Sequence, residues 1–276
     1  MSKEKGTTQK AEVGLWGESY GQVGAALKAL QDHGVGRSHL KKLRADPGYA
    51  QRVAQAFLRV RDEKSAVEFG LMKDFRRACM ILGEDIVFPD EIAEAFGLSY
   101  TSAKLRHFAE TLPSEEVLRW CKENGYAIVA GPPKPVSFLD IRSSSPENFI
   151  VKSGGWIEDE NQLFGKEDKA NHEWLMIRKG TVPRCFMLEW DNQIQFLSSE
   201  ERVPNVAELV WFIIAFYRVR KVFLFNEIYV RTSSITLNGQ HVEIGVHDSS
   251  TILIASPRSN NTLGLRLGIA SARKLS

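Results

Sequence analysis

The segment from residue 205 to residue 218 constrains the fold of this chain more than any other. Asn205 followed by Glu208 matches a capping box, which satisfies the first free backbone N–H groups of a helix, and predicts a helix ending near Arg218. Its side chains are apolar almost all round: Val206, Ala207, Leu209, Val210, Trp211, Phe212, Ile213 and Ile214. A helix with so little polar surface must be covered on most sides, so we expect it to be the central helix of a C-terminal domain. A membrane span needs roughly twenty apolar residues, and the run 209–217 is far shorter.

Strand-like runs accompany this helix in the second half of the chain. One precedes it at 174–177, and those after it are 222–225, 227–232, 235–237, 241–246, 251–255 and 263–269. Asn238-Gly239 predicts a tight hairpin, because both central positions of such a turn need positive φ. We therefore expect an antiparallel meander packed on the apolar helix.

The first half of the chain has helical periodicity instead. Residues 1–18 are polar and predict a flexible leader. From 19 to 130 apolar residues recur at helical spacing, apart from a strand-like run at 126–130. Gly131-Pro-Pro-Lys-Pro135 then interrupts regular structure. We predict a helical domain at 19–130, a Pro-rich linker at 131–135 and an α+β domain at 136–276, so the fold class is α+β.

Composition excludes several classes of protein and points to a compartment. The chain has 276 residues, 43% apolar and 25% charged, with a net charge of +2, which is typical of globular domains rather than disordered or coiled-coil chains. Cys79, Cys121 and Cys185 form no CxxC pair, so we expect buried or partly buried free thiols in a reducing compartment. Residues 1–10 lack the apolar core of a signal peptide. We predict a soluble, cytoplasmic protein that does not enter a membrane.

Basic side chains are concentrated between residues 37 and 77, where eleven bases stand against five acids. Arg37, Lys41 and Arg44 are spaced by four and three residues, which places them on one face of a helix. The other bases of this candidate surface are Arg52, Arg59, Arg76 and Arg77. A basic face of this kind fits the phosphate backbone of a nucleic acid, and we predict nucleic acid as the partner.

Residues 89–107 have the outline of a helix-turn-helix. Gly97 is placed to make the turn, and Thr101 to cap a second helix that presents Lys104 and Arg106, the last members of the candidate set. Residues 84–116, however, hold eight acids and two bases, and a duplex repels such a segment. We therefore interpret the two helices as an ordinary helical hairpin. These acids also leave an alternative open for the bases at 37–77, which is internal ion pairing.

No motif of covalent or metal-dependent catalysis is present. The sequence has no GxSxG, HExxH, Walker P-loop or GxGxxG pattern, so we predict no catalytic residue, no cofactor and no metal ligand. His241, Glu243 and His247 share one face of a strand, but a rise of roughly 3.3 Å per residue sets the histidines about 20 Å apart, too far to share a zinc ion. We interpret that face as the solvent-exposed side of a sheet.

Two segments are where we expect a pocket if the C-terminal domain has one. The first is the polar stretch 158–172, because loops longer than about 12 residues without secondary structure are often functional. The second is the segment 271–274. A mobile surface insertion is the competing interpretation of the first.

Seven short segments carry a resemblance to a known group of proteins: LPSEEVLRWC at 112–121, NGY at 124–126, GPP at 131–133, GGW at 154–156, RVPN at 202–205, VRTSS at 230–234 and SARK at 271–274. They are similar to a family of uncharacterised bacterial proteins, known mainly as hypothetical proteins of metagenome-derived, reduced-genome lineages. The resemblance covers about residues 110–276. It implies a bacterial, soluble, stand-alone protein. It implies no activity and no role for any residue.

Three functional hypotheses follow, and we favour the first. It is a non-enzymatic binding protein that contacts nucleic acid through the basic residues named above. The second is an enzyme of unassigned class with a pocket in the C-terminal domain. The third is a structural or partner-binding protein, which would expose an apolar patch or form an oligomer; the sequence leaves the oligomeric state open.

Overall fold

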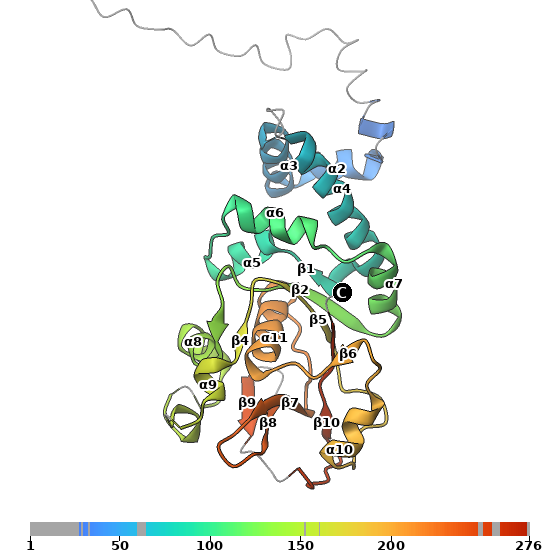
Figure 1. The fold of residues 1–276 in the computed structure, drawn as a ribbon. Coiled ribbons are helices and arrows are strands. Elements are labelled where there is room, and N and C mark those ends of the chain that lie inside the picture. The colour runs from blue at the N-terminus through green and yellow to red at the C-terminus, as the bar shows by residue number, and fades with distance from the viewer. Residues whose placement is uncertain are drawn as a thin grey trace, which may run out of the picture. The chain divides into compact units, whose positions relative to one another are not determined.

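The computed structural model (Figure 1) describes residues 28, 30–32, 34–59, 65–151, 153–159, 161–247, 251–255 and 260–274. Within these ranges, side chains are described except at 54–59, 65–73, 247 and 251–255. The leader that we predicted at 1–18 lies outside the described residues. The chain divides into two compact units, 1–69 and 70–276. Among the helices of the described residues, none combines the length and the apolarity needed to cross a bilayer.

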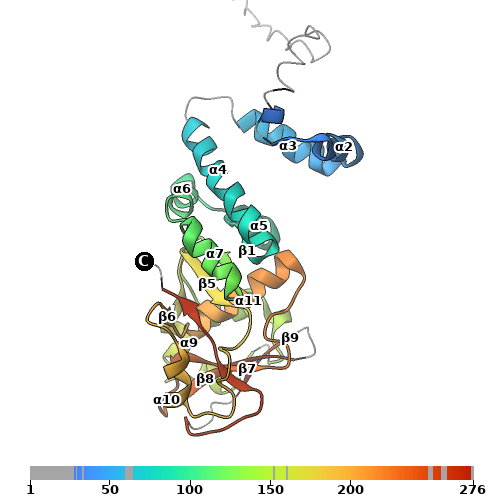
Figure 2. The same cartoon turned by 90° about the vertical axis from the view of Figure 1, so that its right-hand side faces the viewer.

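The described part of unit 1 is a pair of helices, drawn in blue in Figure 2. Helix α2 (Arg37–Ala45) and helix α3 (Pro47–Arg59) are joined by Asp46 and pack against each other. The Asp46 carboxylate accepts the backbone N–H of Tyr49 at 2.9 Å, and proline at the first position of α3 has no N–H that needs a partner. The ammonium of Lys42 lies 5.1 Å from the ring centroid of Tyr49, which ties the two helices together.

Unit 2 is an α+β fold, as predicted. Helix α4 crosses the division between the units, and the elements from there on are α4 (Ser65–Leu82), η2 (Gly83–Asp85), β1 (Ile86–Val87), α5 (Pro89–Phe96), α6 (Ser102–Glu110), α7 (Glu115–Glu123), β2 (Tyr126–Ala130), β3 (Val136–Ser137), α8 (Phe138–Ser144), η3 (Pro146–Asn148), η4 (Trp156–Glu158), α9 (Phe164–Glu167), β4 (Lys169–Ala170), β5 (Trp174–Arg178), α10 (Trp190–Gln193), η5 (Ile194–Phe196), β6 (Glu201–Arg202), α11 (Val206–Arg220), β7 (Tyr229–Ile235), β8 (His241–His247), β9 (Thr251–Ala255), β10 (Leu267–Ile269) and β11 (Ala272–Arg273). The strands form a five-stranded sheet in the order β1-β2-β5-β11-β6, a four-stranded sheet in the order β10-β7-β8-β9, and the small pair β3-β4.

Helix α11 is the central helix, as its sequence predicts. Residues 206–216 are all buried, and the helix contacts both β2 and β5 of the larger sheet and β7 and β8 of the smaller one (Figure 1). The predicted capping box is present: the backbone N–H of Glu208 donates to Asn205 Oδ1 at 2.8 Å, and that of Asn205 donates to Glu208 Oε2 at 2.9 Å. Apolar side chains on every face are therefore covered by a sheet or by α5 and α8.

The smaller sheet contains the predicted hairpin, but its turn and the strand pattern around it differ from the prediction. Strands β7 and β8 pair antiparallel on either side of Asn238-Gly239; Gly239 has φ +73°, whereas Asn238 does not have the positive φ that the predicted turn requires. The backbone N–H of Gly239 donates to the Thr236 carbonyl at 2.9 Å. The runs predicted at 227–232 and 235–237 belong to one strand, β7, whose register shifts between Arg231 and Ile235. The strand predicted at 222–225 does not form. Strand β10 is shorter than the predicted 263–269 and pairs parallel to β7, so the set is not purely antiparallel.

Residues 131–135, which we predicted to separate two domains, lie inside unit 2. Strand β2, immediately before them, pairs along its whole length with β5, and one continuous apolar core includes side chains from Ala78 to Ala272. The change from helical to strand periodicity takes place within this core. The reason is that a sheet needs helices over its faces, and here the helices precede the sheet in the sequence.

Helices α6 and α7 cover one face of the larger sheet. The ring of Trp174 lies 5.1 Å from that of Phe108, and its Nε1–H donates to the Phe108 carbonyl at 2.9 Å. The ring of Trp120 lies 4.9 Å from that of Tyr126. Thr101 caps α6 as predicted: its Oγ1 accepts the backbone N–H of Lys104 at 3.4 Å. Ser114 Oγ accepts the backbone N–H of Val117 at 3.4 Å in the same way at the start of α7.

Candidate functional site

The bases predicted on α2 are on its surface. Arg37, Lys41 and Arg44 are all exposed, and none forms an ion pair with another residue in the described part of the chain. No side chain of α2 is buried and its first turn holds no acid. The helix therefore contributes little to a core, and its basic face is open.

This arrangement costs stability in the isolated protein. Arg37 and Lys41 are like charges at positions i and i+4, a spacing that destabilises a helix by about 0.2–0.5 kcal/mol. Arg37 also lies at the positive end of the helix dipole, where a cation is unfavourable. A bound polyanion would remove both penalties.

Helix α3 continues the basic surface of unit 1. Arg52 is exposed, with no ion pair among the described residues, and Arg59 ends the helix. The side chain of Arg59 lies outside the described part. Between residues 34 and 59 the chain has six bases and a single acid, Asp46, and that carboxylate is engaged at the start of α3.

The other four candidates belong to unit 2. Arg76 is exposed on α4, whereas Arg77 is bound to Asp74 and lies 3.6 Å from a carboxylate oxygen of Glu115. On α6, Lys104 donates to the carbonyl of Pro133 and Arg106 is exposed. The nine predicted residues therefore do not form one set. The bases of α2 and α3 belong to unit 1. Of the four in unit 2, Arg77 and Lys104 are engaged in contacts within the protein.

The acids of the segment 84–116 that form ion pairs do so mainly with bases from outside 37–77. Asp85 pairs with Lys179 at 2.7 Å and with Lys122 at 3.4 Å. Arg220, at the end of α11, binds Glu91 at 2.7 Å. Arg77 of 37–77 pairs with this acidic segment through Glu115. Internal pairing, the alternative interpretation of the basic segment, does not account for Arg37, Lys41, Arg44 and Arg52, which have no ion pair among the described residues.

The face of β8 that we interpreted as solvent-exposed is buried. His241 is 8% exposed and Glu243 is 1% exposed; the side chain of His247 is not described. The ring of Trp190 stacks on His241 at a centroid distance of 3.4 Å, and Arg231 Nε lies 3.9 Å from Glu243. Segments 181–197 and 260–267 cover this face, which periodicity within β8 does not reveal. Burial lowers the pKa of His241 and the charge of Arg231 lowers it further, so the ring is neutral at pH 7.

Burial also affects the protonation of the cysteine thiols. It raises the pKa of the Cys121 thiol to about 12 and raises the pKa of Cys185 as well. Cys121 and Cys185 are buried as expected, whereas Cys79 is exposed on α4, contrary to the prediction. A raised pKa disfavours the thiolate, the reactive form of cysteine. In the part of the chain that the structure describes, no group of three or more His, Cys, Asp or Glu side chains is arranged to hold a metal ion.

A pocket of about 530 Å³ opens on the face of the larger sheet that α6 and α7 cover. Its lining residues come from three stretches, within 107–117, 173–176 and 273–274. The last belongs to the segment 271–274, one of the two places where we expected a pocket. The other, 158–172, does not line it: in its described part it forms α9 and β4, and Phe164 is buried against Trp156.

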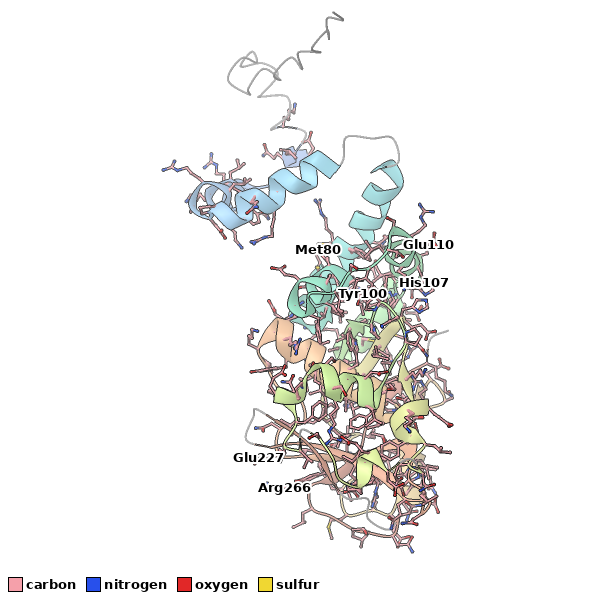
Figure 3. The ribbon with its side chains drawn as sticks, turned by 90° about the vertical axis from the view of Figure 1, so that its left-hand side faces the viewer. Met80, Tyr100, His107, Glu110, Glu227 and Arg266 are labelled. Carbon is pink, nitrogen blue, oxygen red and sulfur yellow. The ribbon has the colours of Figure 1, made fainter. Side chains whose placement is uncertain are left out.

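Large exposed apolar side chains are dispersed. Met80 on α4 is 79% exposed and Leu265, before β10, is 80% exposed. Figure 3 places Met80 far from Arg266, the neighbour of Leu265. Single exposed apolar side chains are ordinary on protein surfaces, so they do not favour the partner-binding hypothesis over the others.

Comparison with known proteins finds no relative of this chain. No protein-family model matches the chain, and no curated protein and no solved structure is significantly similar to it.

Proposed function

We propose that the protein binds nucleic acid through the phosphate backbone, using Arg37, Lys41 and Arg44 of α2 together with Arg52 of α3. The observation that supports this most directly is that these four side chains are exposed and have no ion-pair partner among the described residues. Two acids of the other unit, Asp85 and Glu91, pair with bases of that same unit. Phosphate contacts from such bases give affinity without sequence preference. Arg59 is included in the proposed surface by its place at the end of α3.

The resemblance in residues 110–276 and the free thiols of Cys79, Cys121 and Cys185 support a further part of the proposal. The protein is a bacterial, cytoplasmic protein, in the compartment where nucleic acid is accessible. The proposal requires no catalysis and no cofactor.

A salt series with matched variants tests the proposal. The full chain is titrated into a short fluorescent duplex DNA at about 50 to 200 mM salt, the range over which phosphate contacts change affinity strongly. The test variant carries Arg37→Gln, Lys41→Gln and Arg44→Gln. The control carries Lys134→Gln, Lys166→Gln and Lys169→Gln, which removes the same charge from exposed positions of unit 2.

We expect the unmodified protein and the control to bind with affinity that falls steeply with salt. Each phosphate contact contributes about 0.9 to the slope of log K against log salt, so the test variant should lose about three from that slope and bind at least about tenfold more weakly at low salt. Equal slopes for the test and control variants, or no binding of the duplex by the unmodified protein at the lowest salt, would reject the proposal.

A further inference from the structure

The pocket beside α6 and α7 has an apolar wall of partly exposed side chains, those of Leu112, Pro113 and Val117. Trp174 and Met176 of β5 also border it but are only 2% and 3% exposed, so they support the wall rather than offer surface. The Trp174 ring is fixed by its hydrogen bond to the Phe108 carbonyl and by edge contact with Phe108 itself. Small-molecule sites are typically pre-formed clefts of about 300–1,000 Å³ with apolar walls and a few placed polar groups, and this pocket has that character.

The bases of the pocket are already engaged by the protein. The Arg273 guanidinium lies 4.4 Å from the ring centroid of Trp120 and 3.9 Å from a carboxylate oxygen of Glu200. The Lys274 ammonium donates to the carbonyl of Ser199 at 2.6 Å. Both bases are therefore held by contacts within the protein.

The acids of the pocket are not engaged. Glu110, at the end of α6, and Glu173, before β5, are exposed and form no hydrogen bond or ion pair through their side chains within the described residues. Arg202, whose charge interacts with Glu173, is bound by both carboxylate oxygens of Glu208 at 2.7 and 2.8 Å. Figure 3 shows Glu110 and His107 one turn apart on α6, at the same side of unit 2. Within the described residues, the two carboxylates are therefore the charged groups of this pocket that have no hydrogen-bond or ion-pair partner of their own.

We propose that the pocket binds a small organic cation, a primary ammonium group on an apolar body. The ammonium donates to the carboxylates of Glu110 and Glu173, and the apolar body lies against the partly exposed side chains of Leu112, Pro113 and Val117. An ammonium has three N–H donors and no acceptor, so two acceptors without competing partners suit it. A carboxylate or phosphate ligand would be repelled by these acids and would have to displace the contacts of Arg273 and Lys274. This site is independent of the nucleic-acid surface on α2 and α3.

The test uses three ligands of similar shape and different charge. They are 2-phenylethylammonium, neutral 2-phenylethanol and anionic 3-phenylpropionate, each measured against the full chain by saturation-transfer NMR and calorimetry. Binding of the ammonium is then measured in Glu110→Gln and Glu173→Gln. The matched control is Glu94→Gln, which removes an exposed, unpaired helical acid of α5 that does not line the pocket.

We expect 2-phenylethylammonium to bind saturably and more tightly than the other two ligands. Because a hydrogen bond to a charged group contributes strongly to binding free energy, each pocket variant should weaken binding of 2-phenylethylammonium about tenfold. The control variant should leave that binding unchanged. Unchanged circular dichroism and melting temperature confirm that the variants fold. The proposal is overturned if the ammonium does not bind, if the anion binds as well, or if the pocket variants bind the ammonium as the control does. Each of these results leaves DNA binding by α2 and α3 unaffected, so the two proposals fail separately.

Discussion

Gly131 shows why a segment with the composition of a linker belongs to the core of unit 2. Its backbone N–H donates to the Glu173 carbonyl at 2.9 Å, and its carbonyl accepts the hydroxyl of Tyr100 at 2.7 Å. A Cβ at this position would lie 1.8 Å from the carbonyl oxygen of Asn171 and 2.8 Å from that of Glu173. Glycine is needed here because two backbone segments approach closely, not because the chain must bend freely.

The substitution Gly131→Ala should therefore destabilise unit 2 by about 3 kcal/mol, the upper part of the range for overpacking, because backbone atoms must move. Urea unfolding of the full chain measures this. Gly180→Ala is the control, since a Cβ at Gly180 meets nothing within 4 Å. A loss of stability no larger than in the control would show that 131–135 is not packed as described.

The burial of His241 predicts that the stability of the fold depends on pH. Burial lowers its pKa in the folded state, Arg231 adds to the shift, and Asp191 opposes it. The pKa of histidine in the unfolded chain is about 6.5. Because the folded pKa of His241 is lower, the unfolded chain binds the proton more tightly than the folded one. The stabilisation is therefore fully present above pH 6.5 and is lost as the pH falls below that value. We expect the free energy of unfolding to fall between pH 7.5 and pH 5.5 and His241→Gln to reduce this fall; an equal fall in the variant would exclude His241 as its source.

At the scale of elements, α11 and α2 differ most in how far their side chains are buried. Residues 206–216 of α11 are buried on all sides, whereas α2 has no buried side chain. Burial stabilises a helix in proportion to the apolar area removed from water, so α11 supports the fold and α2 is free to carry charge. This contrast is what connects α2 to binding rather than to stability.

The contrast gives a prediction for single truncations. Ile213→Ala in α11 should cost about 2–5 kcal/mol of unfolding free energy, because it leaves a cavity at a fully buried position. Ile235→Ala, at a position that is 52% exposed in β7, should cost less than about 1 kcal/mol. Chemical denaturation of both variants checks the ranking, and similar losses would mean that α11 does not carry the core.

At the scale of the whole molecule, the two units divide the proposed functions. The nucleic-acid surface uses α2 and α3 of unit 1, and the pocket uses α6, α7, β5 and β11 of unit 2. The apolar core of unit 2 includes side chains from Ala78 to Ala272. Unit 2 therefore has a core of its own.

A fragment of residues 65–276, which begins at the first residue of α4, should unfold cooperatively and retain the pocket. It should bind the fluorescent duplex at least about tenfold more weakly than the full chain at low salt, because the phosphate contacts of α2 and α3 are gone. Thermal melting and the duplex titration measure both properties. Duplex binding equal to that of the full chain would place the interface in unit 2.

Local features of this fold follow from the sequence by itself, because they depend on neighbouring residues. Asn205 and Glu208 cap α11 and Thr101 caps α6, as predicted, and a hairpin forms around Gly239, although its turn is not of the predicted type. The exposed face of α2 follows in the same way from the spacing of its bases. Tertiary structure decided which strands pair and which charges stay free: β1 joins β2, β10 lies parallel to β7, and the pocket collects three stretches far apart in the chain. These contacts depend on residues distant in sequence that meet only when the core forms, so no local pattern contains them.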